Sequence, residues 1–231
     1  MGITRKEVEE KIEENDLDGL LYLTGLIHGH HCVGSAMGVI AAHYAMKTLG
    51  IKESTGMEHV IAVVETNSCF SDGVQLVTGC TFGNNSLVYH DYGKTAFSLV
   101  KRNGEGIRLS RKRDLGDLLR DKRPKALRFS RLVNERDVTP EEEARIIELN
   151  KEHCYNILEI PAEKIFDIEE VHVNLPDYSQ ILGSLVCPSC GEKFMENKAV
   201  KEGSRYLCPD CGGEYGVLDW RGIHIVSEEF E

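Results

Sequence analysis

The sequence has no long apolar run, and no segment approaches the roughly 18 consecutive apolar residues that indicate a membrane-spanning helix. Its first residues form neither a basic nor an apolar leader, which predicts a cytoplasmic protein that does not associate with membranes. Basic residues are also fewer than acidic ones. Because 27 Lys and Arg face 38 Asp and Glu, the formal net charge is -11, which disfavours general binding to nucleic acids. Repeats and low-complexity tracts are absent, so solenoids are excluded.

Cysteine, in contrast, is abundant. The eight cysteines lie at positions 32, 69, 80, 154, 187, 190, 208 and 211. In a reducing compartment this number indicates metal ligation or thiol chemistry before disulfides. The functional residues are therefore expected among the cysteines and their neighbours.

The last four cysteines form two CxxC pairs. Cys187 and Cys190 make the first pair, Cys208 and Cys211 make the second, and 17 residues separate the pairs. This spacing is typical of a closed four-thiolate zinc site with a structural role. A single iron in rubredoxin-like coordination, or an iron–sulfur centre, is the alternative. The few residues around the two CxxC pairs bury little apolar surface. The metal is therefore expected to supply much of the folding free energy, about 10 kcal/mol.

The composition shifts toward Gly and Cys after the connector that begins at Leu175 and Pro176. This shift predicts a large domain at 1–181 and a small finger domain at 182–231. Within the finger we expect the aromatic and basic side chains to form the core rather than a partner surface. These side chains are Tyr206, Tyr215, Trp220 and Arg221.

The large domain is expected to be of the α+β class, a mixed-sheet core with flanking helices. Predicted helices cover 4–15, 35–49 and 71–78, and predicted strands cover 59–65, 86–91 and 95–100, the last two around a turn at Gly93. Thr4 and Glu7 form the pattern of a capping box at the first helix.

Charge is uneven along the chain. Residues 101–136 hold 13 basic and 5 acidic side chains, whereas residues 137–170 hold 3 basic and 11 acidic ones. Thr139 and Pro140 predict a helix start at the beginning of the acidic segment. Two interpretations stay open: a solvated helix pair with opposite faces, or an anionic partner bound to residues 101–136.

A second group of metal-ligand residue types lies near the N-terminus. His28, His30 and Cys32 alternate, so an extended backbone over 28–32 would project all three side chains from one face. Cys69 lies between a predicted strand and a predicted helix, so both thiols are expected at helix N-termini. The pattern predicts a mixed His/Cys metal site, and the alternative is that some of these residues are buried polar groups satisfied by the backbone.

Cys80 and Lys94 are harder to place. A helix over 71–79 would hold Cys80 about 13 Å from Cys69, too far to share one ion. Cys80 would then belong to another part of the site, to a subunit interface, or be a free thiol. Lys94 lies in a Gly-Lys-Thr sequence, but Val88 stands where a phosphate loop needs glycine. Lys94 is therefore expected either to hold an anionic group or to be a plain surface lysine.

Taken together, these motifs resemble the family named for the FmdE subunit of formylmethanofuran dehydrogenase. The shared motifs run from His28 to Gly34, from Cys69 to Gln75, from Thr78 to Asn84 and from Asp91 to Phe97. The resemblance implies a homodimeric α+β core followed by a four-cysteine finger of treble-clef or zinc-ribbon-like type. It also implies association with the molybdenum or tungsten enzyme of methanogenesis that reduces carbon dioxide onto methanofuran. His31 and Val33 depart from the family's usual apolar residue and proline.

The leading hypothesis is a metal-binding protein of C1 metabolism with a structural zinc finger and a second metal, zinc or another transition metal, in the core. Its expected core ligands are His28, His30, Cys32 and Cys69, and its expected catalytic residues are Asp72, Cys80 and Lys94. Such a chain lacks pterin-binding and ferredoxin-like motifs, so it cannot perform the oxidoreduction alone. The alternatives are an inactive structural subunit and a metal-sensing, delivery or regulatory module. That module would contact a protein or nucleic acid through the finger and residues 101–136.

Overall fold

The structure is a computed structural model, and it describes residues 4–53, 56–116 and 138–227. The chain divides into two compact units, Met1–Pro176 and Asp177–Glu231. No helix in the described ranges is long and apolar enough to cross a membrane.

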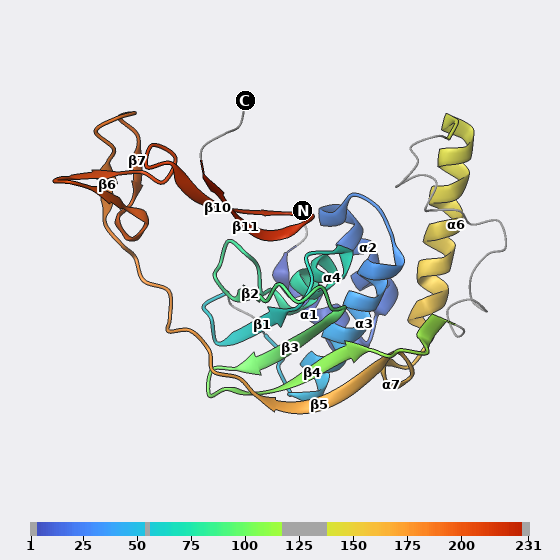
Figure 1. Cartoon of the computed structure of the whole chain (residues 1–231). Coiled ribbons are helices and arrows are strands. Elements are labelled where there is room, and N and C mark those ends of the chain that lie inside the picture. The colour runs from blue at the N-terminus through green and yellow to red at the C-terminus, as the bar shows by residue number, and fades with distance from the viewer. Residues whose placement is uncertain (1–3, 54–55, 117–137, 228–231) are drawn as a thin grey trace. The chain divides into compact units, whose positions relative to one another are not determined.

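The first unit combines helices with one sheet (Figure 1). Its elements are α1 (Arg5–Glu14), α2 (Leu17–His28), α3 (Val33–Thr48), β1 (Val60–Val64), α4 (Cys69–Thr78), β2 (Leu87–Tyr89), β3 (Ala96–Lys101), β4 (Glu105–Arg111), α6 (Pro140–Leu158), α7 (Ala162–Ile165) and β5 (Phe166–His172). Thr4 caps α1 in a capping box with Glu7, as the sequence indicated. The α+β class is confirmed.

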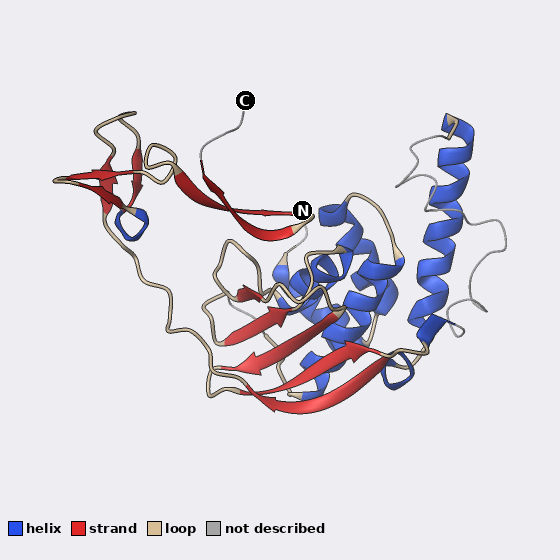
Figure 2. Cartoon of the chain, in the orientation of Figure 1, coloured by secondary structure: helices blue, strands red, loops and turns tan. Residues whose placement is uncertain are grey.

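The five strands form one mixed sheet in the order β2-β1-β3-β4-β5, and helices α1 to α4 cover one face of it (Figure 2). β1 runs parallel to β2 through the crossover helix α4, while the remaining pairs are antiparallel. The two strands expected around Gly93 therefore do not form a hairpin. β1 lies between them, because Val63 pairs with Val88 on one side and with Ser98 on the other.

Helices α3 and α4 approach each other through glycine. A Cβ atom on Gly38 would lie 2.1 Å from the carbonyl oxygen of Phe70, and one on Gly73 would lie 2.5 Å from that of Ser35. Both distances are shorter than any real contact, so only glycine permits this packing. The close crossing sets the N-termini of the two helices next to each other, and Phe70 fills the core beneath them in edge contact with Phe97.

The prediction that the two charged segments form a pair of helices is wrong for the part of the basic segment that the structure describes. Residues 105–111 form strand β4, and residues 117–136, most of the basic segment, lie outside the described residues. Opposite charges meet across a sheet instead: Arg108 is the register partner of Glu169, with 3.9 Å between their charged atoms. Thr139 does cap α6, accepting the Glu142 backbone N–H at 3.3 Å.

The described part of the second unit contains three antiparallel hairpins. Its elements are β6 (Ser184–Val186), β7 (Lys193–Met195), the short 3-10 helix η2 (Glu196–Lys198), β8 (Val200–Glu202), β9 (Arg205–Leu207), β10 (Glu214–Asp219) and β11 (Gly222–Ser227). In the described part of this unit, Cys211 leads into the β10–β11 hairpin and not into a helix. Of the two expected finger types, the zinc-ribbon-like one therefore fits the unit better.

Candidate functional site

The four-cysteine cluster is formed by two similar turns. Each turn follows a short strand. The carbonyl of the first cysteine accepts a hydrogen bond from the N–H of the glycine that follows the second cysteine. These bonds join Gly191 to Cys187 at 2.9 Å and Gly212 to Cys208 at 2.8 Å. The four sulfur atoms lie within 4.8 Å of one another. A set of four thiolates at this separation fits a tetrahedral zinc ion.

Backbone N–H groups point at the thiols of this cluster. The N–H groups of Cys190 and Cys208 lower the pKa of the Cys187 thiol to about 6. The Cys211 N–H donates to the Cys208 sulfur at 3.4 Å. Donors of this kind stabilise the thiolate form, which is the form that binds metal.

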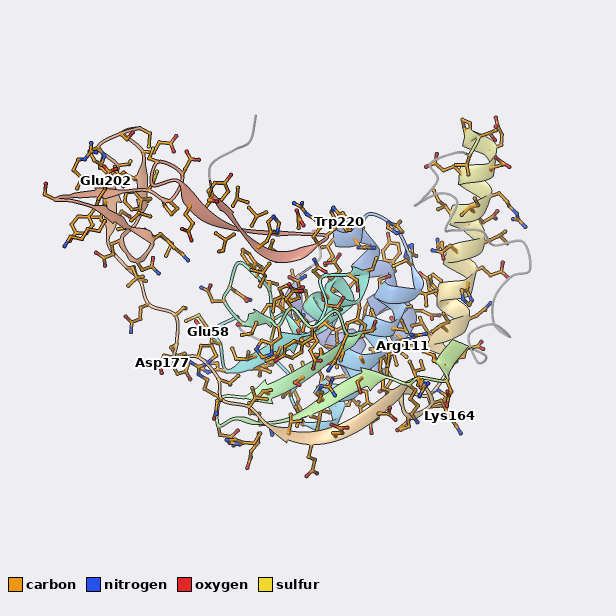
Figure 3. The ribbon with its side chains drawn as sticks, viewed as in Figure 1. Glu58, Arg111, Lys164, Asp177, Glu202 and Trp220 are labelled. Atoms are coloured by element: carbon orange, nitrogen blue, oxygen red, sulfur yellow. The ribbon has the colours of Figure 1, made fainter. Side chains whose placement is uncertain are left out.

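Apart from the thiols, little holds this unit together. In its described residues the buried hydrophobic side chains are Cys187, Leu207 and Cys208. The expectation that the aromatic and basic residues form the core is wrong for Trp220, which is 87% exposed at the turn between β10 and β11 (Figure 3). It is also wrong for Tyr206 and Arg221, which are exposed. A core of this size supports the prediction that metal binding drives folding of the unit.

The second candidate site lies where three helix ends of the first unit meet. α2 ends at His28, α3 begins after Cys32, and α4 begins at Cys69. The extended backbone expected over 28–32 is wrong at its start, because His28 is helical and Gly29 ends the helix in the left-handed conformation with φ 82°. α4 follows β1, so Cys69 lies beyond the carboxyl end of a strand that is parallel to its neighbour, a usual place for ligand sites.

The structure nevertheless brings the first three expected ligands together. One donor atom each from His28, His30 and Cys32 lies within 4.8 Å of the others. The two imidazole rings are 4.4 Å apart, centroid to centroid. Two imidazoles and a thiolate are a donor set suited to zinc and several other transition metals.

Asp72 lies behind His28. Its carboxylate is 2.7 Å from Nδ1 of His28 and accepts a second bond from the Gln75 amide at 3.2 Å. Because an ionised carboxylate only accepts, Nδ1 of His28 is the donor of this bond. Nε2 faces the Cys32 sulfur at 3.6 Å. A carboxylate behind an imidazole in this manner orients ligand histidines in metal sites.

Cys32 occupies the N-cap of α3. Its sulfur accepts the Ser35 backbone N–H at 3.3 Å, and its own N–H donates to the Ser35 hydroxyl at 3.2 Å. The Cys69 thiol, followed by these Ser35 donors, lowers the pKa of Cys32 to about 5 against the opposing effect of burial. The same contact raises the pKa of Cys69. The contact between the two thiols therefore favours the thiolate form of Cys32 and the protonated form of Cys69.

The other two expected catalytic residues lie elsewhere. Cys80 is fully buried beyond the far end of α4, and its thiol donates to the Val60 carbonyl at 3.4 Å. Burial raises its pKa to about 11, as befits a core residue. The Lys94 ammonium lies 5.5 Å from the centre of the Tyr92 ring. Its backbone N–H bonds to the Glu65 carbonyl at the end of β1, so the loop that carries Lys94 adjoins the segment leading to Cys69.

Sequence reasoning missed the contribution of α6. Cys154 is fully buried on this helix, and its pKa is raised by burial and by the neighbouring Cys32 thiolate. Asn150 donates to the His31 carbonyl, and Tyr155 contacts the His31 ring at 5.8 Å. His31 thus faces α6. The signal in the sequence was the 3–4 spacing of buried positions along 146–158, which a pattern search reads as ordinary core.

Sequence reasoning also missed a buried ion pair at the end of β1. Glu65 is 5% exposed and accepts two bonds from Arg108, at 2.6 and 2.9 Å. A bidentate pair of this kind fixes the loop that leads to Cys69 against β4.

The fold and the four-cysteine cluster define a two-unit metal-binding protein with a four-cysteine finger. Comparison with known protein families identifies the protein more closely. A family described as "FmdE, Molybdenum formylmethanofuran dehydrogenase operon" matches residues 27–167, and one described as "Zinc finger protein-like" matches residues 171–219. The chain belongs to the FmdE family, and its cysteine cluster lies in a zinc finger domain.

Two similar proteins are informative. A curated relative from Archaeoglobus fulgidus, described as a probable S-adenosyl-L-methionine-binding protein, is 37% identical over 93% of this chain, which spans 58% of the relative's length. A protein from Syntrophus aciditrophicus, whose crystal structure is described as like the FmdE subunit of tungsten formylmethanofuran dehydrogenase, is 22% identical, with a TM-score of 0.55. The match covers 85% of this chain and 92% of that one. That similarity supports the fold.

Proposed function

We propose that this protein holds a transition metal in the first unit, in addition to the zinc of the finger, and serves C1 metabolism beside a molybdenum or tungsten formylmethanofuran dehydrogenase. The observation that carries the metal site is the convergence of His28, His30 and Cys32 within 4.8 Å. The link to C1 metabolism follows from the family name.

The residues around this site have separate tasks. His28, His30 and Cys32 bind the ion, Cys69 lies next to Cys32 as a further thiol ligand, and Asp72 fixes the His28 ring through the 2.7 Å bond. A metal bound here supplies Lewis-acid chemistry at any position the protein leaves open. The helix N-termini of α3 and α4 add positive potential that favours anionic ligands at the site.

Metal content per chain tests the proposal. The intact chain, purified without oxygen, is expected to hold two metal ions, and the Cys32→Ala variant is expected to hold one, in the finger. Asp72→Asn is a graded variant: it keeps the shape of the side chain but loses the charge behind His28, so core metal affinity should fall about 10–100-fold. Elemental analysis and a competition titration with a chromophoric chelator measure these two effects.

Cys80→Ala is the matched control, since Cys80 is as buried as Cys32 but lies at the other end of α4. It should keep both metals. An intact chain with one metal, or a Cys32→Ala variant with two, contradicts the core site.

The Archaeoglobus relative suggests a second function, binding of S-adenosyl-L-methionine. The 37% identity over 93% of this chain is what favours it. Calorimetric titration of the intact chain with S-adenosyl-L-methionine tests it, and the absence of binding would assign that property to the part of the relative that this chain does not span.

A further inference from the structure

Helix α6 carries a buried amide in a face that is mostly apolar. The buried positions of the helix are Ile146, Leu149, Asn150, His153, Cys154, Ile157 and Leu158. Asn150 is 3% exposed. A buried side-chain amide costs free energy unless its polar atoms find partners, and an apolar side chain of the same size would pack without that cost. An asparagine at position 150 therefore calls for a specific partner.

Its partner is the backbone of the segment that carries the expected metal ligands. The side-chain nitrogen of Asn150 donates to the His31 carbonyl. This carbonyl belongs to the peptide unit that joins His31 to Cys32, and the N–H of the same unit donates to the Ser35 hydroxyl at 3.2 Å. Because a peptide unit is planar, bonds at both of its ends fix its orientation. Helix α6 thus holds one end of the unit and α3 holds the other.

The orientation of this peptide unit determines where the Cys32 side chain points. Cys32 has extended backbone angles, φ -141° and ψ 161°, so its side chain and that of His31 lie on opposite sides of the chain. The His31 ring contacts Tyr155 of α6, whereas the Cys32 sulfur lies 3.6 Å from Nε2 of His28. A rotation of the peptide plane would therefore move the sulfur relative to the His28 ring.

The His31 ring itself serves packing. A Cβ atom on Gly25 of α2 would lie 2.9 Å from its Cε1 atom, and the centre of the Tyr155 ring lies 5.8 Å from its own centre. Its Nε2 atom is buried and has no hydrogen-bond partner within the described residues. The ring thus fills the space between α2 and α6, and the polar link from α6 to this segment is the bond from Asn150.

We propose that Asn150 is a positioning residue of the core metal site, which sets the direction of the Cys32 side chain through the peptide unit between His31 and Cys32. The inference rests on the proposed function, since it requires an ion at the core site. It makes the packing of α6 part of metal binding. By linkage, the packed helix raises the affinity for the ion, and the bound ion holds the helix more firmly.

The Asn150→Leu variant tests the proposal, because leucine has nearly the same size but cannot donate to the His31 carbonyl. The full chain with zinc in the finger is titrated with Co²⁺, whose visible absorption bands report the ligands and their geometry. In the intact chain the bands of a core site should appear, and Cys32→Ala should abolish them. Asn150→Leu should bind core Co²⁺ about tenfold more weakly, with bands changed in position and intensity.

Amide hydrogen exchange gives a second measurement. Co²⁺ should slow exchange in residues 146–158 of the intact chain, and it should no longer do so in Asn150→Leu. The matched control is Ile157→Ala, since Ile157 is also fully buried on α6 but packs in the hydrophobic core. This variant should unfold at lower urea concentration and keep both the Co²⁺ bands and the effect of Co²⁺ on exchange.

The outcomes separate this inference from the proposed function. An intact chain without core Co²⁺ bands contradicts both. If the intact chain shows these bands and Asn150→Leu keeps the same bands and affinity, the role of Asn150 alone is wrong. Equal spectral changes in Asn150→Leu and Ile157→Ala also overturn it, because they would show that α6 acts only through stability. If the leucine variant does not fold, Asn150→Asp carries the same test, since an ionised carboxylate of similar size only accepts.

Discussion

The two candidate metal sites of this protein are assembled in different ways. The finger site takes its four ligands from two short turns of similar geometry, each with cysteines three residues apart. The core site takes its ligands from the ends of three helices, and Cys32 and Cys69 are brought together by a glycine-mediated crossing of α3 and α4. The comparison shows that a local pattern suffices for one site, whereas the other depends on packing of the whole unit.

Loss of a finger thiol should give the largest effect. The Cys208→Ala variant leaves three of the four expected zinc ligands and removes one of the few buried side chains of the second unit. We therefore expect zinc to be lost and residues 177–227 to unfold. Zinc analysis and limited proteolysis of the second unit measure this. The first unit should retain its near-UV circular dichroism, and a variant whose first unit also unfolds would show that the two sites are not independent.

A packing change in the first unit should impair the core site and leave the finger site intact. In Gly73→Ala the new Cβ would meet the Ser35 carbonyl at 2.5 Å, so α3 and α4 must move apart. We expect a loss of about 3 kcal/mol in the free energy of unfolding of the first unit, with weaker binding of core metal. Urea denaturation measures the first and elemental analysis the second. Unchanged finger zinc is the internal control, and unchanged core metal contradicts the role assigned to the crossing.

The smallest effect concerns pH. The pKa of Cys32 is lowered to about 5 and that of Cys187 to about 6. In the metal-free chain, iodoacetamide should therefore still label Cys32 as a thiolate at pH 6, and labelling should fall below pH 5. Because the folded pKa lies below the ordinary value of 9.0, the thiolate stabilises the folded core fully above pH 9, and this contribution declines as the pH falls toward 5. Cys69→Ala should raise the pH at which Cys32 labelling is half complete, and an unchanged value contradicts the pairing.

Several elements could be predicted from the sequence. The capping patterns at Thr4 and Thr139 located two helix starts. The strand order could not be predicted in the same way. Whether β2 and β3 pair with each other or flank β1 depends on the crossover helix α4, and pairing between distant segments leaves no local pattern.

The sequence by itself determined the finger site, because two CxxC turns impose their own geometry and the ion supplies the remaining order. It also determined which residue types approach the N-termini of α3 and α4. Only the tertiary structure decided which of them meet. It placed Cys69 beside Cys32, Asp72 behind His28 and Cys80 in the main hydrophobic core beyond the other end of α4. The physical reason is that these contacts are set by the closest approach of helices at Gly34, Gly38 and Gly73, and a glycine in the sequence does not state which backbone will lie against it.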